Sequence, residues 1–351
     1  ITYYWPPFGG SGVQRWLKHV KYLRDYDWEP VVFTSDNGEV PVLDPSLEKD
    51  IPKNIEVIRF PIWEPYNVYK KITGKNESFE PGLISKASKG GFLDRLSVFI
   101  RGNFFIPDAR MFWIKPSVKF LIKYLKENHV DAIVSTGPPH STHMIALSVK
   151  KSIDIPWIAD FRDPWTKIEF YKKLKLTKWA DRKHRKFESQ VLRQSDKVVT
   201  VSWKWASDLK KEHKRNVEVI TNGYDCDDFN ELDIKFTNQF NVLHCGVMKE
   251  NRNPIVLWEA LSRICKENKN FKKLLSIDII GNCDDDIIAS IRLNNLEGNL
   301  KILPYVSHDE IINIMGSSQI LLLAIENTPD SQGIIPGKLY EYMASKRPIL
   351  A

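Results

Sequence analysis

The sequence predicts an α/β protein built from two doubly wound domains, each a parallel sheet covered by helices, that face a cleft. Short apolar segments alternate with amphipathic segments of helical spacing along most of the chain. A polar, acidic stretch at residues 225–238 interrupts this alternation, and a second series of the same kind follows it. The length of 351 residues fits two domains. We therefore expect domains at 1–224 and 239–351, joined by a linker at 225–238.

In the first domain, apolar runs bounded by turn residues predict the strands, and periodic apolar residues predict the helices. The expected strands are residues 2–5, 31–34, 55–60, 131–136, 155–159, 197–201 and 217–221. The expected helices are residues 13–25, 92–105, 118–127, 178–193 and a segment that begins at 141. Residues 66–91 are rich in Lys, Ser and Gly and predict a mobile loop.

The second domain repeats this pattern. Its expected strands are residues 241–245, 276–280, 301–303 and 320–324, and its expected helices are residues 255–267, 285–293, 309–315 and 337–345. Ligands of such sheets bind beyond the carboxyl ends of the strands. Candidate site residues are therefore expected in the loops that follow strands.

Composition limits the class of protein and of partner. No run approaches the ~20 apolar residues of a membrane span. The four cysteines are widely spaced without a Cys-x-x-Cys pattern, which indicates neither a disulfide framework nor a zinc site and fits a reducing cytoplasm. A net charge of +7 and a pI near 9.0 favour an anionic partner, such as a phosphorylated ligand, an acidic lipid or nucleic acid. The chain opens inside a strand-like segment and stops inside an apolar run, so we expect a fragment whose second domain is incomplete.

The helix expected at residues 337–345 carries the main candidate site. Gly337 permits close approach of a ligand to the backbone, the helix start offers N–H groups to an anion, and Lys338 adds a positive charge. Glu341 lies one turn further and could accept hydrogen bonds from ligand hydroxyls. These features fit a nucleotide sugar, although an ordinary surface helix with a solvated glutamate explains the same residues.

A second cationic loop follows the first strand of the second domain. Gly246 begins the loop, and Lys249 and Arg252 follow it. Together they could clamp a diphosphate, since the Arg fork matches phosphate oxygens. Two cations in a loop are often only solvated, but Lys338 is expected on the same edge of the same sheet.

Two loops of the first domain are candidates for the acceptor side. Gly9, Gly10, Ser11 and Gly12 form a loop after the first expected strand, where glycines permit close approach of a phosphate or sugar; a plain strand–helix turn is the alternative. This loop lacks the G-x-G-x-x-G dinucleotide fingerprint.

Polar residues also follow two central strands of the first domain. His140 could hydrogen-bond a ligand or be an uninvolved loop residue. Asp160, Arg162 and Asp163 could position a general base or an acceptor hydroxyl, or form a self-contained ion-pair cluster. We interpret these four as the catalytic candidates and expect no metal site.

A basic segment at residues 167–187 carries aromatic anchors at Trp179 and Phe187 and few acids. This pattern is typical of a helix on an anionic membrane surface, although a solvated helix face has the same composition.

Four motifs in order resemble those of glycosyltransferase family 4, a family of retaining enzymes with the GT-B fold. They are residues 3–10, with Tyr-Tyr-Trp-Pro-Pro-x-Gly-Gly; residues 220–229, with Asn-Gly-Tyr-Asp; residues 244–252, with His-x-Gly, Lys249 and Arg252; and residues 303–310. The resemblance covers nearly the whole chain.

The resemblance implies a donor that is a nucleotide-diphosphate sugar held by the second domain, with no cofactor. Lys249 and Arg252 would neutralise the diphosphate, Glu341 would bind the ribose, and the acceptor would lie against the first domain. It also implies bacterial capsule, O-antigen (lipopolysaccharide) or exopolysaccharide synthesis on a lipid carrier. The expected location is the cytoplasm, with peripheral contact at the inner face of an anionic membrane.

One position departs from the family pattern. Where the family has the first of two glutamates, this chain has Gly333, while Glu341 matches the second. The Gly333 backbone, Glu326 or Asp330 could take its place. Two other classes of function stay open: a nucleotide-sugar epimerase of the same fold, and a non-catalytic module that binds membrane or nucleic acid. Nucleic acid is disfavoured because the Trp residues lie largely at apolar spacing rather than among cations.

Overall fold

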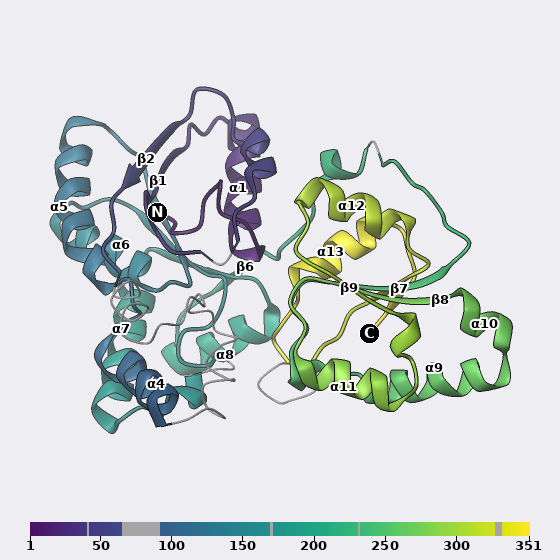
Figure 1. Ribbon diagram of the computed structural model, residues 1–351. Coiled ribbons are helices and arrows are strands. Elements are labelled where there is room, and N and C mark those ends of the chain that lie inside the picture. Colours follow the sequence, from purple (N-terminus) through teal and green to yellow (C-terminus); the bar gives the residue numbers. More distant parts are fainter. Residues whose placement is uncertain (41, 65–91, 169–170, 231, 327–331) are drawn as a thin grey trace. The chain divides into compact units, whose positions relative to one another are not determined.

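A computed structural model describes residues 1–40, 42–64, 92–168, 171–230, 232–326 and 332–351 (Figure 1). The loop expected at residues 66–91 and the alternative at Asp330 lie outside the described residues. The chain divides into two compact units. Unit 1 comprises Ile1–Thr221 with Gln332–Ile334, and unit 2 comprises Asn222–Ser331 with Ile335–Ala351. Residues 225–238, expected as a linker, thus group with unit 2 and contain the short helix η4 (Cys226–Phe229).

Unit 1 contains two parallel sheets. A pair is formed by β1 (Val31–Ser35) and β2 (Glu56–Phe60). Four more strands lie in the order β3 (Ile133–Gly137), β4 (Trp157–Phe161), β5 (Lys197–Thr200) and β6 (Glu218–Val219). Because every pair in both sheets is parallel, the carboxyl ends of β3 and β4 lie at one edge, where the sequence placed the catalytic candidates.

The strand expected at residues 2–5 is not a strand in the structure. Its backbone is nevertheless bonded on both sides. The Thr2 N–H donates to Phe33 O at 3.0 Å, and the Thr136 N–H donates to Ile1 O at 3.2 Å. This short segment therefore lies between β1 and β3, with too few ladder bonds to form a regular strand.

The helices of unit 1 are α1 (Ser11–Leu23), α4 (Phe92–Phe104), α5 (Met111–Glu127), α6 (Ser141–Ser152), α7 (Lys178–Gln194) and α8 (Trp203–His213), with the 3-10 turns η1 (Arg24–Tyr26), η2 (Pro45–Asp50) and η3 (Tyr171–Leu174). Two differ from the sequence prediction. Helix α5 begins seven residues before the expected start and contains Pro116 in its second turn. Helix α8 was not predicted.

Unit 2 is a five-stranded parallel sheet in the order β11-β10-β7-β8-β9. Its strands are β7 (Phe240–Cys245), β8 (Leu275–Ile280), β9 (Leu300–Leu303), β10 (Ile320–Leu322) and β11 (Ile349–Leu350). Its helices are α9 (Ile255–Glu267), α10 (Lys269–Leu274), α11 (Asp285–Leu293), α12 (His308–Ser317) and α13 (Gly337–Ala344), with the turns η5 (Glu250–Arg252) and η6 (Glu297–Asn299).

Each face of the unit 2 sheet has its own core. Trp258 of α9 and Ile287 of α11 pack with Ile277 on one face, whereas Ile312 of α12 and Tyr342 of α13 pack in a separate cluster on the other. Figure 1 shows α12 and α13 on the side of the sheet opposite α9 and α11. Helices on both faces of a parallel sheet define the doubly wound arrangement that the sequence predicts. Among the described residues, no helix combines the length and apolar character needed to cross a membrane.

Candidate functional site

Two glycines lie against each other where β7 and β8 end in unit 2. The Gly246 N–H donates to Ile280 O at 2.7 Å, and a Cβ added at Gly281 would lie 2.9 Å from Gly246 O. Gly246 has φ +97° and Gly281 has φ +116°, backbone conformations that L side chains rarely adopt. Glycine is required at both positions, and the result is an exposed stretch of backbone at the carboxyl edge of the sheet.

Lys338 lies directly over this glycine turn. Its Nζ donates to Cys245 O at 2.5 Å and lies 3.2 Å from where a Cβ on Gly246 would be. Pro336 precedes α13 and supplies no side-chain cap, so the helix start carries its positive dipole end beside the ammonium group. Burial, followed by the nearby positive charge of Arg252, lowers the pKa of Lys338 to about 8.

Arg252 belongs to the same cationic group. Its charge also lowers the pKa of the buried His244, after burial itself and Lys338; the resulting value is about 3, so His244 is neutral. Lys249 is the N-cap residue of η5, which ends at Arg252. We define the cationic pair as Lys338 and Arg252, two positive charges on the carboxyl edge of one sheet.

Tyr342 fixes the position of α13 relative to β7. Its hydroxyl accepts a hydrogen bond from the Cys245 N–H at 3.1 Å, and its side chain is fully buried. Helix α13 is therefore bound to the last residue of β7 twice, through the Cys245 N–H and through its carbonyl.

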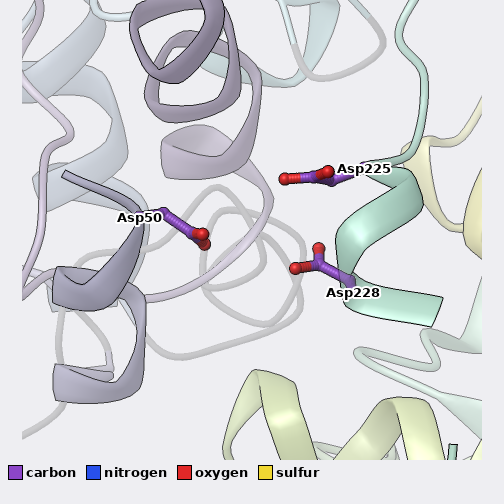
Figure 2. Close-up of side chains that lie close together, drawn as sticks. All are labelled: Asp50, Asp225 and Asp228. Atoms are coloured by element: carbon purple, nitrogen blue, oxygen red, sulfur yellow. The ribbon is translucent and has the colours of Figure 1, made fainter. Parts of the chain in front are cut away.

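Glu341 lies beside a buried histidine. His308, the first residue of α12, has its Nε2 3.2 Å from Asp228 Oδ2 and its Nδ1 4.0 Å from Glu341 Oε1. Figure 2 shows Asp225 and Asp228 at the start and end of the first turn of η4, and Asp50 of unit 1, which accepts a hydrogen bond from Lys18 at 2.7 Å. In unit 2 the imidazole thus lies between two carboxylates, one from the Asn-Gly-Tyr-Asp motif and one from α13.

In unit 1, Arg162 joins the two candidate loops. Its guanidinium donates to Gly12 O at 2.8 Å and to Pro138 O at 2.9 Å, and its Cζ lies 5.8 Å from the centre of the Tyr4 ring. The first turn of α1 and the loop at residues 137–140 therefore share one cation. Gly10, with φ +89°, is the N-cap of α1, so Ser11 and Gly12, which the sequence placed in the loop, lie in the first turn of the helix.

Asp160 points into the interior instead of towards a substrate. Its carboxylate accepts hydrogen bonds from Arg15 through two nitrogens at 3.2 Å, from Trp16 Nε1 at 2.7 Å and from Thr136 Oγ1 at 2.9 Å. Asp160 and Arg15 are both almost fully buried. This favours the ion-pair alternative for Asp160, as a residue that positions α1 on the sheet.

His140 is a buried ring at the end of β3. It stacks on Trp165 with ring centres 4.4 Å apart and an interplanar angle of 2°. Among the described residues its Nδ1 has no hydrogen-bond partner. Burial lowers the pKa of His140 well below its usual value, with a further contribution from His143, so the ring is neutral at physiological pH. A neutral imidazole donates one hydrogen bond through one ring nitrogen and accepts one through the other.

Asp163 follows Arg162 and lies close to β3. Its N–H donates to Gly137 O at 3.4 Å, and burial raises the pKa of its carboxyl group, partly opposed by Arg162. Asp163 is thus placed beside the same loop that Arg162 holds.

The structure brings Gly246, Arg252, Lys338 and Glu341 together in unit 2, with Gly337 at the helix start. In unit 1 it brings His140, Arg162 and Asp163 to the ends of β3 and β4 and joins them to Gly12. Gly333 groups with unit 1, whereas the other donor candidates group with unit 2. Glu326, an alternative to the missing glutamate, accepts a hydrogen bond from Asn251 at 2.8 Å.

Sequence reasoning gave no role to Trp165, Asp228 or His308, although Asp228 and His308 stand inside two of the quoted motifs. Their spacing along the chain gives no signal that they meet.

Comparison with solved structures gives the fold. The chain is similar to sucrose-phosphate synthase from Thermosynechococcus elongatus (TM-score 0.60, 13% identity, 97% of this chain and 75% of that chain). It is also similar to WaaG, a glycosyltransferase involved in lipopolysaccharide biosynthesis (TM-score 0.54, 14% identity, 99% of this chain and 79% of that chain). A third similar structure is the α,α-trehalose-phosphate synthase (UDP-forming) from Burkholderia vietnamiensis (TM-score 0.53, 10% identity, 93% of this chain and 77% of that chain). No curated protein sequence matches the chain.

These likenesses and the two parallel-sheet units define the fold as that of the GT-B glycosyltransferases. The sequence model of Glycosyltransferase Family 4 matches residues 75–228 of the chain. The resemblance inferred from the four motifs is thereby confirmed.

Proposed function

We propose that this protein is a retaining glycosyltransferase that moves a sugar from a nucleotide-diphosphate sugar to a hydroxyl acceptor. The observation that carries the proposal is the cationic pair. Lys338 lies over the exposed backbone of Gly246, and Arg252 is near enough for its charge to lower the pKa of Lys338. Two cations and a helix N-terminus at one sheet edge are suited to a diphosphate.

The proposed chemical role of Lys338 and Arg252 is to stabilise the leaving nucleotide diphosphate. As the bond between the anomeric carbon and the diphosphate oxygen breaks, negative charge grows on that oxygen. Lys338 and Arg252 would stabilise this charge, as a metal ion does in other transferases. We propose that the reaction requires no metal ion and no cofactor, which predicts full activity in the presence of a chelator. Lys249 would add a third cation to the diphosphate site.

Glu341 is the proposed partner of the ribose hydroxyls. A carboxylate one helical turn from the phosphate-binding helix start can accept two hydrogen bonds from a diol. The backbone at Gly337 would contact the diphosphate itself. Of the alternatives to the missing first glutamate, Glu326 remains a proposal for the donor sugar contact, as does the backbone of Gly333.

The acceptor is proposed to bind unit 1 at the joined loops. Gly9, Gly10, Ser11 and Gly12 would offer backbone groups, and His140 would hydrogen-bond a sugar hydroxyl through its neutral ring. Arg162 would hold both loops in place, and Asp163 would assist the acceptor hydroxyl. Asp160 would act only through Arg15 and the helix that it holds.

The pathway proposed is synthesis of a bacterial cell-surface polysaccharide, such as capsule, O-antigen or exopolysaccharide. The basic composition and a lipid-linked acceptor would place the enzyme in the cytoplasm, at the inner face of the membrane. The likeness to WaaG supports this choice through fold alone.

The test is binding and turnover with a matched pair of variants. Isothermal titration with UDP, GDP, ADP and dTDP identifies the nucleotide. Lys338→Met is expected to weaken that binding about tenfold to a hundredfold, because a charge-assisted hydrogen bond is lost. Lys266→Met, an exposed lysine on α9 of the same unit, is the control and is expected to bind normally. Equal affinities in both variants would refute the cationic site.

Turnover distinguishes transfer from epimerisation. The enzyme is incubated with the matching nucleotide sugar, with and without a membrane extract as acceptor, and the products are read by NMR. Transfer with retained anomeric configuration is the expected result. Formation of an epimer of the nucleotide sugar without acceptor would overturn the proposal.

A further inference from the structure

Helix α4 turns an apolar face to solvent. Leu96, Phe99, Ile100 and Phe104 recur at helical spacing, with exposed fractions of 40%, 36%, 40% and 65%. We call these four residues the α4 stripe. Exposed apolar residues are ordinary when scattered singly, but four at i, i+3, i+4 and i+8 share one side of a helix.

The opposite face of α4 is fixed against the rest of unit 1, so the stripe cannot simply rotate inward. Val98 is buried in a cluster with Tyr171 and Leu174 of η3. A Cβ on Gly102 would lie 2.8 Å from Leu176 Cδ2. At the last turn of α4, on the side of the stripe, Asn103 is buried and its Oδ1 accepts a hydrogen bond from the Thr177 N–H at 2.7 Å, which fixes this end of the helix. These contacts determine which side of α4 faces outward.

The segment that holds α4 is strongly basic. From η3 to the first turns of α7 it carries Lys172, Lys173, Lys175, Lys178 and Arg182. Trp179 is 59% exposed in the same stretch, with Lys183 Nζ 4.9 Å from the centre of its ring. The acidic Asp181 is engaged by Tyr171 and Arg185. On α4 itself, Arg95 is exposed. Cations therefore lie on α4 itself and on the segment that packs against it.

Further aromatic rings follow the end of α4. Phe105 lies 6.1 Å from Phe112 between ring centres, and Phe112 lies 4.8 Å from Trp63. Trp63 is 56% exposed and Phe112 is 44% exposed. An apolar helix face with neighbouring aromatic rings and a border of Lys and Arg is the composition that binds the interface of an anionic bilayer.

We propose that the α4 stripe is the membrane-docking surface of this protein, with anionic phospholipid as its partner. The stripe would enter the boundary between head groups and acyl chains, while the cations between Lys172 and Arg182 contact phosphate groups. The inference deepens the proposed function, on which it rests for the meaning of a lipid-linked acceptor. It moves the membrane contact expected from residues 167–187 onto α4, with α7 in an electrostatic role.

The test is co-sedimentation of the whole chain with vesicles. Equal parts of phosphatidylglycerol and phosphatidylcholine are compared with phosphatidylcholine alone. Phe99→Ser combined with Phe104→Ser is expected to weaken binding to the anionic vesicles at least about tenfold. The matched control is Val256→Ser with Leu293→Ser, two exposed apolar side chains of unit 2, which is expected to sediment like the parent protein.

A charge variant tests whether the cations between Lys172 and Arg182 contact lipid phosphate groups. Lys178→Glu with Arg182→Glu is expected to weaken sedimentation with anionic vesicles, and high salt is expected to do the same. Unchanged binding of both α4 and charge variants would overturn the proposal. So would loss of a dimer in the Phe99→Ser/Phe104→Ser variant, by light scattering, because it would assign the stripe to a second copy of the chain.

Nucleotide affinity separates this inference from the proposed function. If the Phe99→Ser/Phe104→Ser variant no longer binds vesicles but binds nucleotide normally, membrane docking by α4 is supported independently of the nucleotide site. If the parent protein binds no nucleotide, the proposed transferase function is refuted, but the measured vesicle binding still supports membrane docking.

Discussion

The side chain of Lys338 donates a hydrogen bond to the carbonyl oxygen of Cys245 at 2.5 Å, which ties the first turn of α13 to the last residue of β7. A lysine in this place carries its charge at the sheet edge where anions bind in doubly wound folds. Its lowered pKa of about 8 means that the charge can be removed within an accessible pH range.

Nucleotide binding is therefore expected to weaken as pH rises from 7 to 9. Lys338 is protonated below its pKa of about 8 and loses its charge above it. A bound diphosphate favours the protonated form, so affinity falls by up to about tenfold per pH unit above the pKa. Titration calorimetry at pH 7, 8 and 9 measures this. Lys338→Met should flatten the dependence and Lys266→Met should keep it; the same slope in both variants would assign the effect elsewhere.

Gly246→Ala is expected to damage both backbone and site. With φ +97°, an L residue at this position is strained by about 1–3 kcal/mol, and the new methyl group would lie 3.2 Å from Lys338 Nζ. Chemical denaturation should show the loss of stability, and calorimetry should show weaker nucleotide binding. Gly298→Ala, whose added Cβ meets nothing within 4 Å, is the control.

His308→Asn is expected to weaken UDP binding a few-fold by releasing Glu341. His308 lies between Asp228 and Glu341, so its removal leaves the Glu341 carboxylate less well oriented. If Glu341 contacts the ribose, the effect should shrink with 2′-deoxy-UDP. An equal loss with UDP and 2′-deoxy-UDP would show that the histidine acts on the fold and not through the ribose.

His140→Phe is expected to lower turnover about tenfold to a hundredfold while leaving nucleotide affinity unchanged. Phenylalanine can keep the stacking with Trp165 but offers no hydrogen bond. Because burial holds the pKa of His140 well below its usual value, the ring stays neutral from pH 6 to 8, and the pH–rate profile should keep its shape in this range. Weaker UDP binding in this variant would contradict its place on the acceptor side.

Asp160→Asn is expected to lower the free energy of unfolding by about 3–5 kcal/mol. The change removes one charge of a buried pair and leaves Arg15 without compensation. Urea denaturation of the variant measures this, with the fully exposed Asp154→Asn as a control expected within about 0.5 kcal/mol of the parent. A stable but inactive Asp160→Asn protein would restore the catalytic interpretation of this carboxylate.

Periodicity located most of the fold because the strands of parallel sheets are continuous apolar runs. The helices at residues 255–267 and 285–293 agree with the structure at both ends. Helix α8 was missed because its apolar residues Trp205, Ala206 and Leu209 are few among lysines. The segment at residues 2–5 looked like a strand because Thr, Tyr and Trp are typical strand residues, yet its backbone makes too few ladder bonds.

Site prediction succeeded for residues next to strand ends and failed for side chains whose partners are distant in sequence. Lys338 and Gly246 could be placed together because both follow neighbouring strands. Asp160 lay at the correct strand end, but the direction of its side chain depends on Arg15 and Trp16, which are 145 and 144 residues away. The meeting of Asp228 with His308 spans 80 residues and likewise required the structure.

Arg162 donates to both Gly12 and Pro138, so the segment that leads from the glycine loop into α1 and the loop after β3 share a single anchor. An attempt to change acceptor choice by transplanting one loop from a relative would leave half of that anchor without its acceptor. A successful exchange would require both segments and Arg162 to be replaced together.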